Sequence, residues 1–300
     1  MSQECYPLDP KPAKTYEEQV DILGSRGLFV ENRTAAINTL STLNYYRLSG
    51  YSLFFQDKNT EQFYPGSSFS QIIALHELDS KLRIALLEIL FDIEITARTR
   101  IAYEIGNAWG PMGYNNELNY QGCDHDQFVK LMDNIHNDTA RSKELFAQTY
   151  NTKYGGQFPI WVAVETMSFG SLSKLYSLIP LAHRRNIAHA YDYLNETLLE
   201  NWLQAISLLR NICAHNSRIL GHPFSFHIQI AQDTKKYIQD VEPNFNINDK
   251  SLFAYLLAVQ RIALPKEWNT FLATFTTLSN QIAFSKLGLP KKWKKILLPK

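Results

Sequence analysis

Cysteine is scarce in this chain of 300 residues, which contains only Cys5, Cys123 and Cys213. An odd and widely spaced set does not make the disulfide framework of a small secreted protein and is typical of a reducing compartment. The sequence also lacks the paired Cys and His spacings that bind zinc, a Gly-rich phosphate loop and a Gly-x-Ser-x-Gly turn. We therefore expect neither a bound metal nor a cofactor.

Long apolar runs are missing as well. No window approaches eighteen uncharged apolar residues, because even the most apolar stretch, residues 84–95, contains Glu88, Asp92 and Glu94. Residues 1–7 include no apolar run that could serve as a signal peptide. These absences predict a soluble cytoplasmic protein that does not associate with a membrane.

An excess of either charge is absent, since 30 Lys and Arg residues face 29 Asp and Glu residues. With a net charge of +1, the chain has no global field that would attract nucleic acid, so such affinity must come from local patches. Hydrophobic residues make up 45% of the chain, which is ample for a core. We find no repeat, low-complexity block or linker, and we predict a single domain over residues 1–300.

Helical periodicity is what the sequence has in abundance. Its strongest signal is a set of apolar residues that recur every three or four positions: Leu75, Leu78, Leu82, Leu86, Ile89, Ile93, Ala97 and Ile101. This stripe predicts one long helix with a single buried face that ends near Gly106. Shorter helices are predicted at residues 16–25, 32–46, 124–152, 159–179, 182–193, 196–215, 250–262 and 267–284.

The segments between these helices are predicted to be irregular. Residues 52–66 suggest a loop or a small hairpin, residues 107–119 a loop, and residues 221–249 a polar passage. The fold class is therefore mostly α. The predicted domain has three parts, which are N-terminal helices with a loop (1–65), a helical core (66–220) and a C-terminal helical extension with a basic tail (221–300).

Arg210, Asn211 and His215 lie at the end of the helix predicted over residues 196–215. Asn211 and His215 are four residues apart and share a helix face. A guanidinium can hold a phosphate through two hydrogen bonds, and an imidazole can transfer protons near neutral pH. Together they are a minimal set for cleaving RNA without a metal. The alternative is a helix end whose Arg and His pair with nearby carbonyls or carboxylates.

The same spacing occurs a second time, in Arg184 and His189. This pair follows the break at Pro180, and we interpret it as the basic surface of a turn and helix.

Two further groups could serve either function or structure. Tyr45, Tyr46 and Arg47, with Tyr51, could stack RNA bases and contact phosphate, or could pack at a helix end.

Glu94 and Arg98 could form an ion pair within one helix, or Glu94 could orient a catalytic residue. Glu165 lies in an apolar run and is expected to have a buried partner such as Arg210 or Arg98.

The C-terminal tail is rich in lysine. Six lysines surround Trp293, namely Lys286, Lys291, Lys292, Lys294, Lys295 and Lys300. Such a tail is either a solvated end or a source of RNA affinity that weakens with salt.

The stretch from Arg210 to Arg218 resembles the signature of the HEPN superfamily, and more narrowly that of Abi abortive-infection proteins of the AbiD/AbiF type. Three other passages resemble the same family in the same order, at residues 43–51 (Leu-Asn-Tyr-Tyr-Arg-Leu-Ser-Gly-Tyr), 92–100 and 161–172. Four ordered blocks are more specific than one short pattern. The resemblance covers about residues 15–220, with a weaker echo at 288–293.

The resemblance implies a HEPN-like helical bundle that acts as a metal-independent endoribonuclease in phage defence, as a toxin or effector. It implies that Arg210 binds the scissile phosphate and that His215 is the general base or acid during attack by the 2′-hydroxyl, which leaves a 2′,3′-cyclic phosphate. Asn211 would hold the imidazole or the turn.

The resemblance further implies a homodimer with a composite site, and a noncoding RNA is a candidate regulator. RNA contacts are expected from Arg47, Arg98, Arg218, Lys291 and Lys292. Two other functions stay open, which are a non-catalytic RNA-binding module and a purely structural helical protein.

Overall fold

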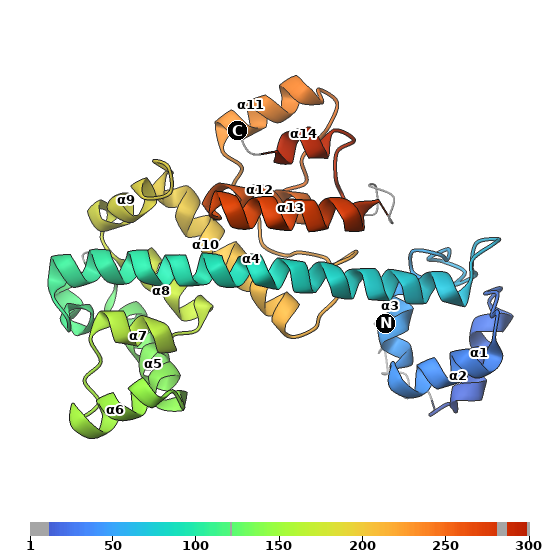
Figure 1. Ribbon diagram of the computed structural model, residues 1–300, viewed down its shortest axis with the longest axis horizontal. Helices are drawn as coiled ribbons and strands as arrows, with labels where there is room; N and C mark the ends of the chain where they lie inside the picture. The colour runs from blue at the N-terminus through green and yellow to red at the C-terminus, as the bar shows by residue number, and fades with distance from the viewer. Residues whose placement is uncertain (1–11, 121, 281–286, 299–300) are drawn as a thin grey trace, which may run out of the picture. The chain divides into compact units, whose positions relative to one another are not determined.

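The computed structural model describes residues 12–120, 122–280 and 287–298. Within these residues the structure is helical and contains isolated β-bridges but no β-strand, so the mostly-α prediction is confirmed (Figure 1). Contacts along the chain divide it into two compact units, Met1–Ser80 and Lys81–Lys300. The predicted single domain and its three parts stay a prediction. The predictions for residues 1–7 and for Cys5 lie outside the described residues.

The first unit contains α1 (Tyr16–Ser25), α2 (Arg33–Thr42), α3 (Tyr45–Ser52) and the first turns of α4 (Phe69–Trp109). The single helix predicted over 32–46 is wrong, because the chain is extended at Leu43. The Asn44 side chain accepts a hydrogen bond from the backbone N–H of Tyr46 and begins a new helix. An Asn that bonds its own neighbouring backbone competes with helix continuation.

Helix α4 is the longest element and carries the predicted stripe. All eight apolar residues of the stripe are buried, as expected. The helix extends to Trp109, beyond the predicted end at Gly106. Gly110 follows it with a φ of 75°, a left-handed conformation that favours glycine at a helix end. The loop after α4 contains two short 3-10 turns, η1 (Gly113–Asn115) and η2 (Glu117–Asn119).

In the second unit, two predicted long helices are each divided in two. The region 124–152 forms α5 (His125–Arg141) and α6 (Leu145–Lys153), and the region 159–179 forms α7 (Ile160–Thr166) and α8 (Phe169–Leu178). Ser168 caps α8 by accepting the backbone N–H of Ser171, which explains the second break.

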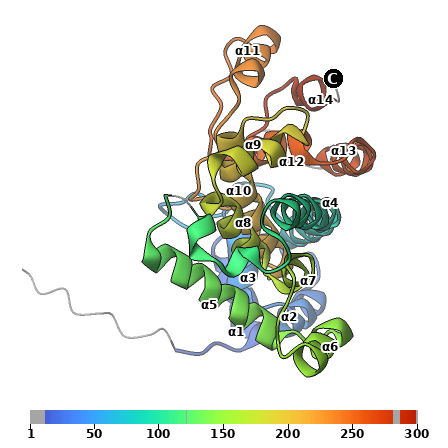
Figure 2. The same ribbon diagram turned by 90° about the vertical axis from the view of Figure 1, so that its left-hand side faces the viewer.

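Helix α10 (Glu196–Ala214) matches its prediction closely, whereas α9 (Leu181–His189) ends four residues before the predicted end at 193. Helix α10 packs against α8, α9 and α12, as Figure 2 also shows. This central position brings the end of α10, with its Arg and His residues, next to several other elements.

The C-terminal part contains more helices than the sequence predicted. It contains α11 (Gln232–Val241), α12 (Leu252–Ile262), α13 (Pro265–Ser279) and α14 (Trp293–Leu297). Helix α11 lies inside the predicted polar passage, and the part of the predicted last helix at 281–284 lies outside the described residues. None of the described helices is both long and apolar enough to cross a bilayer.

Candidate functional site

The end of α10 is shaped by a left-handed turn at Asn216. His215 is the C-cap residue directly after the last helical residue, Ala214, and Asn216 follows with a φ of 58°. The N–H of Asn216 donates to the carbonyl of Cys213 (3.1 Å), and the N–H of Ser217 donates to that of Ile212 (2.9 Å). This is the Schellman pattern, in which a left-handed residue satisfies the last helical carbonyls and Asn is tolerated in place of glycine. The chain therefore turns immediately after His215, which is exposed.

Arg210 is held by a carboxylate from another helix. Its Nε donates to Oε2 of Glu94 on α4 (3.0 Å), and its Nη2 donates to Oε1 of the same carboxylate (3.1 Å). Its Nη1 donates to Oδ1 of Asn211 (3.0 Å). Glu94 is buried with 5% exposure, whereas the Arg210 side chain is 23% exposed. The guanidinium is thus fixed on its buried side by Glu94, and its other side reaches the surface.

Arg98 completes this cluster from the next turn of α4. Its guanidinium donates to Glu94 and to the backbone carbonyls of Val164 and Met167 at the end of α7. The last carbonyls of a helix have no partner within the helix, so Arg98 satisfies two groups that would otherwise be buried unpaired. The cluster holds two cations and one anion, which leaves one positive charge for an anionic ligand.

Glu94 forms the ion pair with Arg98 in its own helix and also accepts hydrogen bonds from Arg210, while a catalytic role for Arg210 stays a prediction. The expectation for Glu165 is wrong. Glu165 is exposed and does not supply the buried carboxylate, because it lies on the solvent-facing side of α7 with Trp161, four residues earlier. Arg98 is buried, and its guanidinium is bonded to protein groups, which speaks against the expected contact with RNA.

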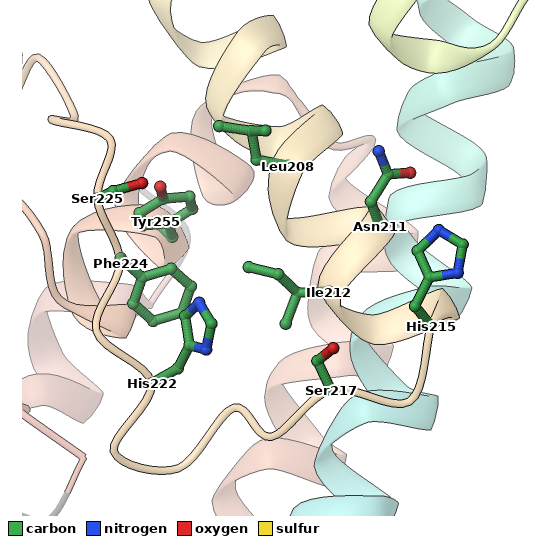
Figure 3. A pocket seen from close by; sticks show the side chains of 9 residues that line it. All are labelled: Leu208, Asn211, Ile212, His215, Ser217, His222, Phe224, Ser225 and Tyr255. Atoms are coloured by element: carbon green, nitrogen blue, oxygen red, sulfur yellow. The ribbon is translucent and has the colours of Figure 1, made fainter. Parts of the chain in front are cut away.

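Asn211 and His215 lie on the surface of α10 beside a pocket of about 270 Å³ (Figure 3). The two side chains lie next to each other on one side of the helix. Because Asn211 also accepts a hydrogen bond from Arg210, it connects the fixed guanidinium with the helix face that carries the imidazole. This arrangement can bind a phosphate and move a proton within one region of the surface.

The second pair with the same spacing lies in a different setting. Arg184 forms an ion pair with Glu200, and Arg185 lies 3.6 Å from Glu196. Both carboxylates belong to α10, so these arginines fix α9 to its neighbour. His189 is exposed at the end of α9.

The remaining candidate residues are dispersed. Arg47 lies in the first unit, where its Nε is 3.4 Å from Nε2 of His76. Arg218 is half-buried just after the turn at Asn216. Lys291 and Lys292 are exposed, and their backbone N–H groups donate to the carboxylate of Glu242. Contact of these residues with RNA stays a prediction.

The lysine-rich tail is not simply a solvated end. Trp293 is fully buried at the start of α14, with its ring centroid 5.1 Å from that of Phe275. The carbonyl of Leu297 accepts a hydrogen bond from the indole of Trp268 (3.0 Å). Lys286 and Lys300 lie outside the described residues.

Four residues that the sequence did not associate with the motif also line the pocket, namely His222, Phe224, Ser225 and Tyr255. Closeness to the motif in the sequence could have indicated the first three, whereas no local signal indicates Tyr255. No group of three or more His, Cys, Asp or Glu side chains gathers as a metal site in the part of the chain that the structure describes.

Fold and site together define a mostly-α protein whose central helix ends in an Arg-x4-His motif that a buried glutamate holds in place. The family model for Abi-like proteins matches residues 38–221, which is more than half of the chain. The chain therefore belongs to the Abi-like family, and this membership suggests a part in abortive infection, a form of phage defence. Comparison with curated proteins and with solved structures gave no match.

Proposed function

We propose that this protein is a metal-independent endoribonuclease of the HEPN type, which acts on RNA in the cytoplasm as the toxic effector of an abortive-infection system. The observation that carries the proposal is the position of Arg210, which is held by Glu94 on one side and bonded on the other to Asn211, whose side chain lies beside the exposed His215 (Figure 3). A fixed cation beside an imidazole supplies what phosphodiester transesterification needs.

In the proposed reaction, the 2′-hydroxyl of the RNA attacks the adjacent phosphorus. The new bond joins O2′ to phosphorus, the bond from phosphorus to O5′ breaks, and a 2′,3′-cyclic phosphate and a 5′-hydroxyl result. Arg210 neutralises charge on the phosphate oxygens. His215 takes the proton from the 2′-hydroxyl or gives one to the leaving O5′. Asn211 holds the guanidinium and the imidazole in a fixed position relative to each other.

A homodimer is part of the proposal, because each chain carries one motif and two motifs across a two-fold axis would form a composite site. The exposed apolar residues Ile84, Phe91 and Ile95 support it. They are spaced at seven and four positions on α4, so they form one stripe on its surface. Exposed apolar stripes of this kind are typical of interaction surfaces.

Cleavage by purified protein tests the proposal. We expect RNA cleavage in the presence of EDTA, with cyclic phosphate ends, and a loss of at least about 100-fold for His215→Ala, within the range of general acid–base catalysis. His189→Ala is the matched control, since His189 ends the second Arg-x4-His pair, and it should cut like the unaltered protein. Cleavage by His215→Ala at the normal rate would reject the assignment.

A second candidate function is supported by one observation. Arg210 already donates to Glu94 and Asn211, so it could recognise a phosphate, for instance in a regulatory noncoding RNA, without assisting a reaction. A non-catalytic module of this kind would bind RNA with an affinity that falls steeply with salt and would produce no cyclic phosphate ends.

A further inference from the structure

The pocket beside the motif has two walls of different origin (Figure 3). One wall is the surface of α10, where Leu208 and Ile212 are apolar. The opposite wall is made by His222 and Phe224, which follow the motif, and by Tyr255 from α12. In Figure 3 the side chain of Ile212 points toward His222 and Phe224, while Asn211 and His215 lie on the adjoining side of the helix.

The opposite wall is a cluster of three aromatic rings. The ring centroids of His222 and Phe224 are 4.9 Å apart, and those of Phe224 and Tyr255 are 4.6 Å apart. Phe224 and Tyr255 are themselves buried, so the half-buried His222 presents the accessible ring of this wall. Aromatic and apolar walls that face one another suit a flat ring system.

The segment that carries this wall is fixed to α10 a few residues further on. The indole N–H of Trp202 donates a hydrogen bond to the backbone carbonyl of Gln229 (2.8 Å). The side-chain amide of Asn201 donates one to the backbone carbonyl of His227 (3.0 Å). The backbone N–H of Gln229 in turn donates to Oδ1 of Asn201 (2.9 Å). The aromatic wall is therefore formed before any ligand arrives.

Two serine side chains of the pocket can form hydrogen bonds with the edge of a bound ring. The exposed Ser217 and Ser225 also line the pocket, and their hydroxyls can donate and accept hydrogen bonds. The volume of about 270 Å³ is just under the range of roughly 300–1,000 Å³ that holds drug-sized ligands, which suits one base rather than a larger molecule.

We infer that this pocket binds one nucleobase of the RNA strand whose phosphate Arg210 holds, an inference that rests on the proposed function of the site. The base stacks on the ring of His222, between this wall and Ile212, and the sugar and phosphate pass over Asn211 toward His215. His222, Phe224 and Tyr255 lie beyond residues 38–221, the region matched by the family model. The C-terminal part of the chain thus adds base selection to a motif that contacts only phosphate and ribose.

Binding of short RNAs tests this inference in the full-length chain with His215→Ala, which should bind RNA without cutting it. The probes are fluorescent pentanucleotides of each single base and a base-free pentamer with the same number of phosphates. Two variants alter the pocket, since His222→Ala removes part of the aromatic wall and Ser225→Trp fills the space. His227→Ala is the control, because His227 belongs to the same segment but lines a different pocket.

We expect at least one base to bind about tenfold more tightly than the base-free pentamer, as one stacked base contributes. Both pocket variants should lose this tenfold advantage, and His227→Ala should keep it. Equal affinity for all probes, or unchanged binding by both pocket variants, overturns the inference.

RNA cleavage by the chain that retains His215 shows whether the base pocket alone or also the proposed nuclease function is wrong. Cyclic phosphate ends formed without any base preference overturn the pocket alone, whereas a chain that neither binds nor cuts RNA overturns both. A base preference that His222→Ala abolishes, without cleavage, supports the pocket and rejects the nuclease.

Discussion

At the scale of single residues, Glu94 connects the most distant parts of the site. Its carboxylate receives Arg98 from its own helix and Arg210 from α10. Because two guanidinium groups share one buried carboxylate, removal of that charge would leave both cations without compensation. We therefore assign Glu94 as a positioning residue that acts through Arg210.

Replacement of this carboxylate tests its role. Glu94→Gln keeps the shape but places an amide N–H₂ against a guanidinium, so we expect the free energy of unfolding to fall by about 1–3 kcal/mol. We also expect RNA cleavage to fall at least about tenfold in kcat/KM, even at temperatures where the variant is fully folded, because Arg210 loses its fixed orientation.

Glu165→Gln is the matched control, since Glu165 is exposed and lies next to Val164, whose carbonyl binds Arg98. Urea unfolding and steady-state cleavage should be unchanged in this control. Full activity of folded Glu94→Gln would show that Arg210 does not depend on the carboxylate.

The sequence predicted Arg210, Asn211 and His215 as a group because their short spacing places them on one helix end. The sequence did not predict which carboxylate binds Arg210, because Glu94 precedes it by 116 positions and no local pattern joins the two residues. Glu165 was the wrong choice for the same reason. Its apolar neighbours suggested burial, but its position around α7 places it on the exposed side with Trp161.

At the scale of elements, Asp138 near the end of α5 fixes the start of α8. Its Oδ2 accepts the backbone N–H of Ser168 (2.9 Å) and the hydroxyl of Ser171 (2.6 Å). Burial would raise the pKa of Asp138, but these hydrogen bonds and Arg141 outweigh it and hold the pKa below its usual range. This contact joins α5 to the segment between α7 and α8 whose carbonyl of Met167 binds Arg98.

A lowered pKa in the folded state makes stability depend on pH in a definite direction. Above the pKa of the unfolded state, near 3.9, the ionised Asp138 contributes its full stabilisation, which is lost as the pH falls through the lower folded value. We expect Asp138→Asn to destabilise the chain by about 1–3 kcal/mol at pH 7. The difference from the unaltered chain should shrink below about pH 4.

Urea unfolding at several pH values measures this difference. Asp133→Asn is the control, because Asp133 lies on the exposed side of the same helix and should show neither effect. A difference between Asp138→Asn and the unaltered chain that stays constant from pH 7 to pH 3 would contradict the role given to the carboxylate.

Helices were predictable where the apolar period is long, as in α4 and α10. Breaks within long periodic regions were missed, because Asn44 and Ser168 each start a helix through a single hydrogen bond. Helix α14 was missed because its five residues are rich in lysine and its burial depends on Trp268 and Phe275 from another element.

At the scale of the whole molecule, the proposed dimer predicts that two inactive variants restore activity when they are combined, which a monomeric enzyme could not do. Because the two motifs of the proposed dimer form one composite site at the two-fold axis, dimers of Arg210→Ala chains or of His215→Ala chains each lack one of the two groups altogether and should be inactive. Mixed after unfolding and refolding together, the two kinds of chain form heterodimers whose composite site contains one Arg210 and one His215.

We therefore expect an equal mixture to recover a substantial part of the activity of the unaltered chain. Cleavage measured at several total concentrations checks this, with a mixture of His215→Ala and Glu94→Gln/His215→Ala chains as a control that should stay inactive. No recovery from the first mixture, in chains that sedimentation identifies as dimers, would place each complete site within one chain.

The attachment of Arg210 on several sides has a consequence for the entropy of binding. A free arginine side chain has about 2 kcal/mol of rotamer entropy to lose when it grips a ligand. Here that loss has already occurred during folding, when Glu94 and Asn211 fixed the guanidinium. Such preorganisation leaves more of the electrostatic attraction available for the phosphate itself.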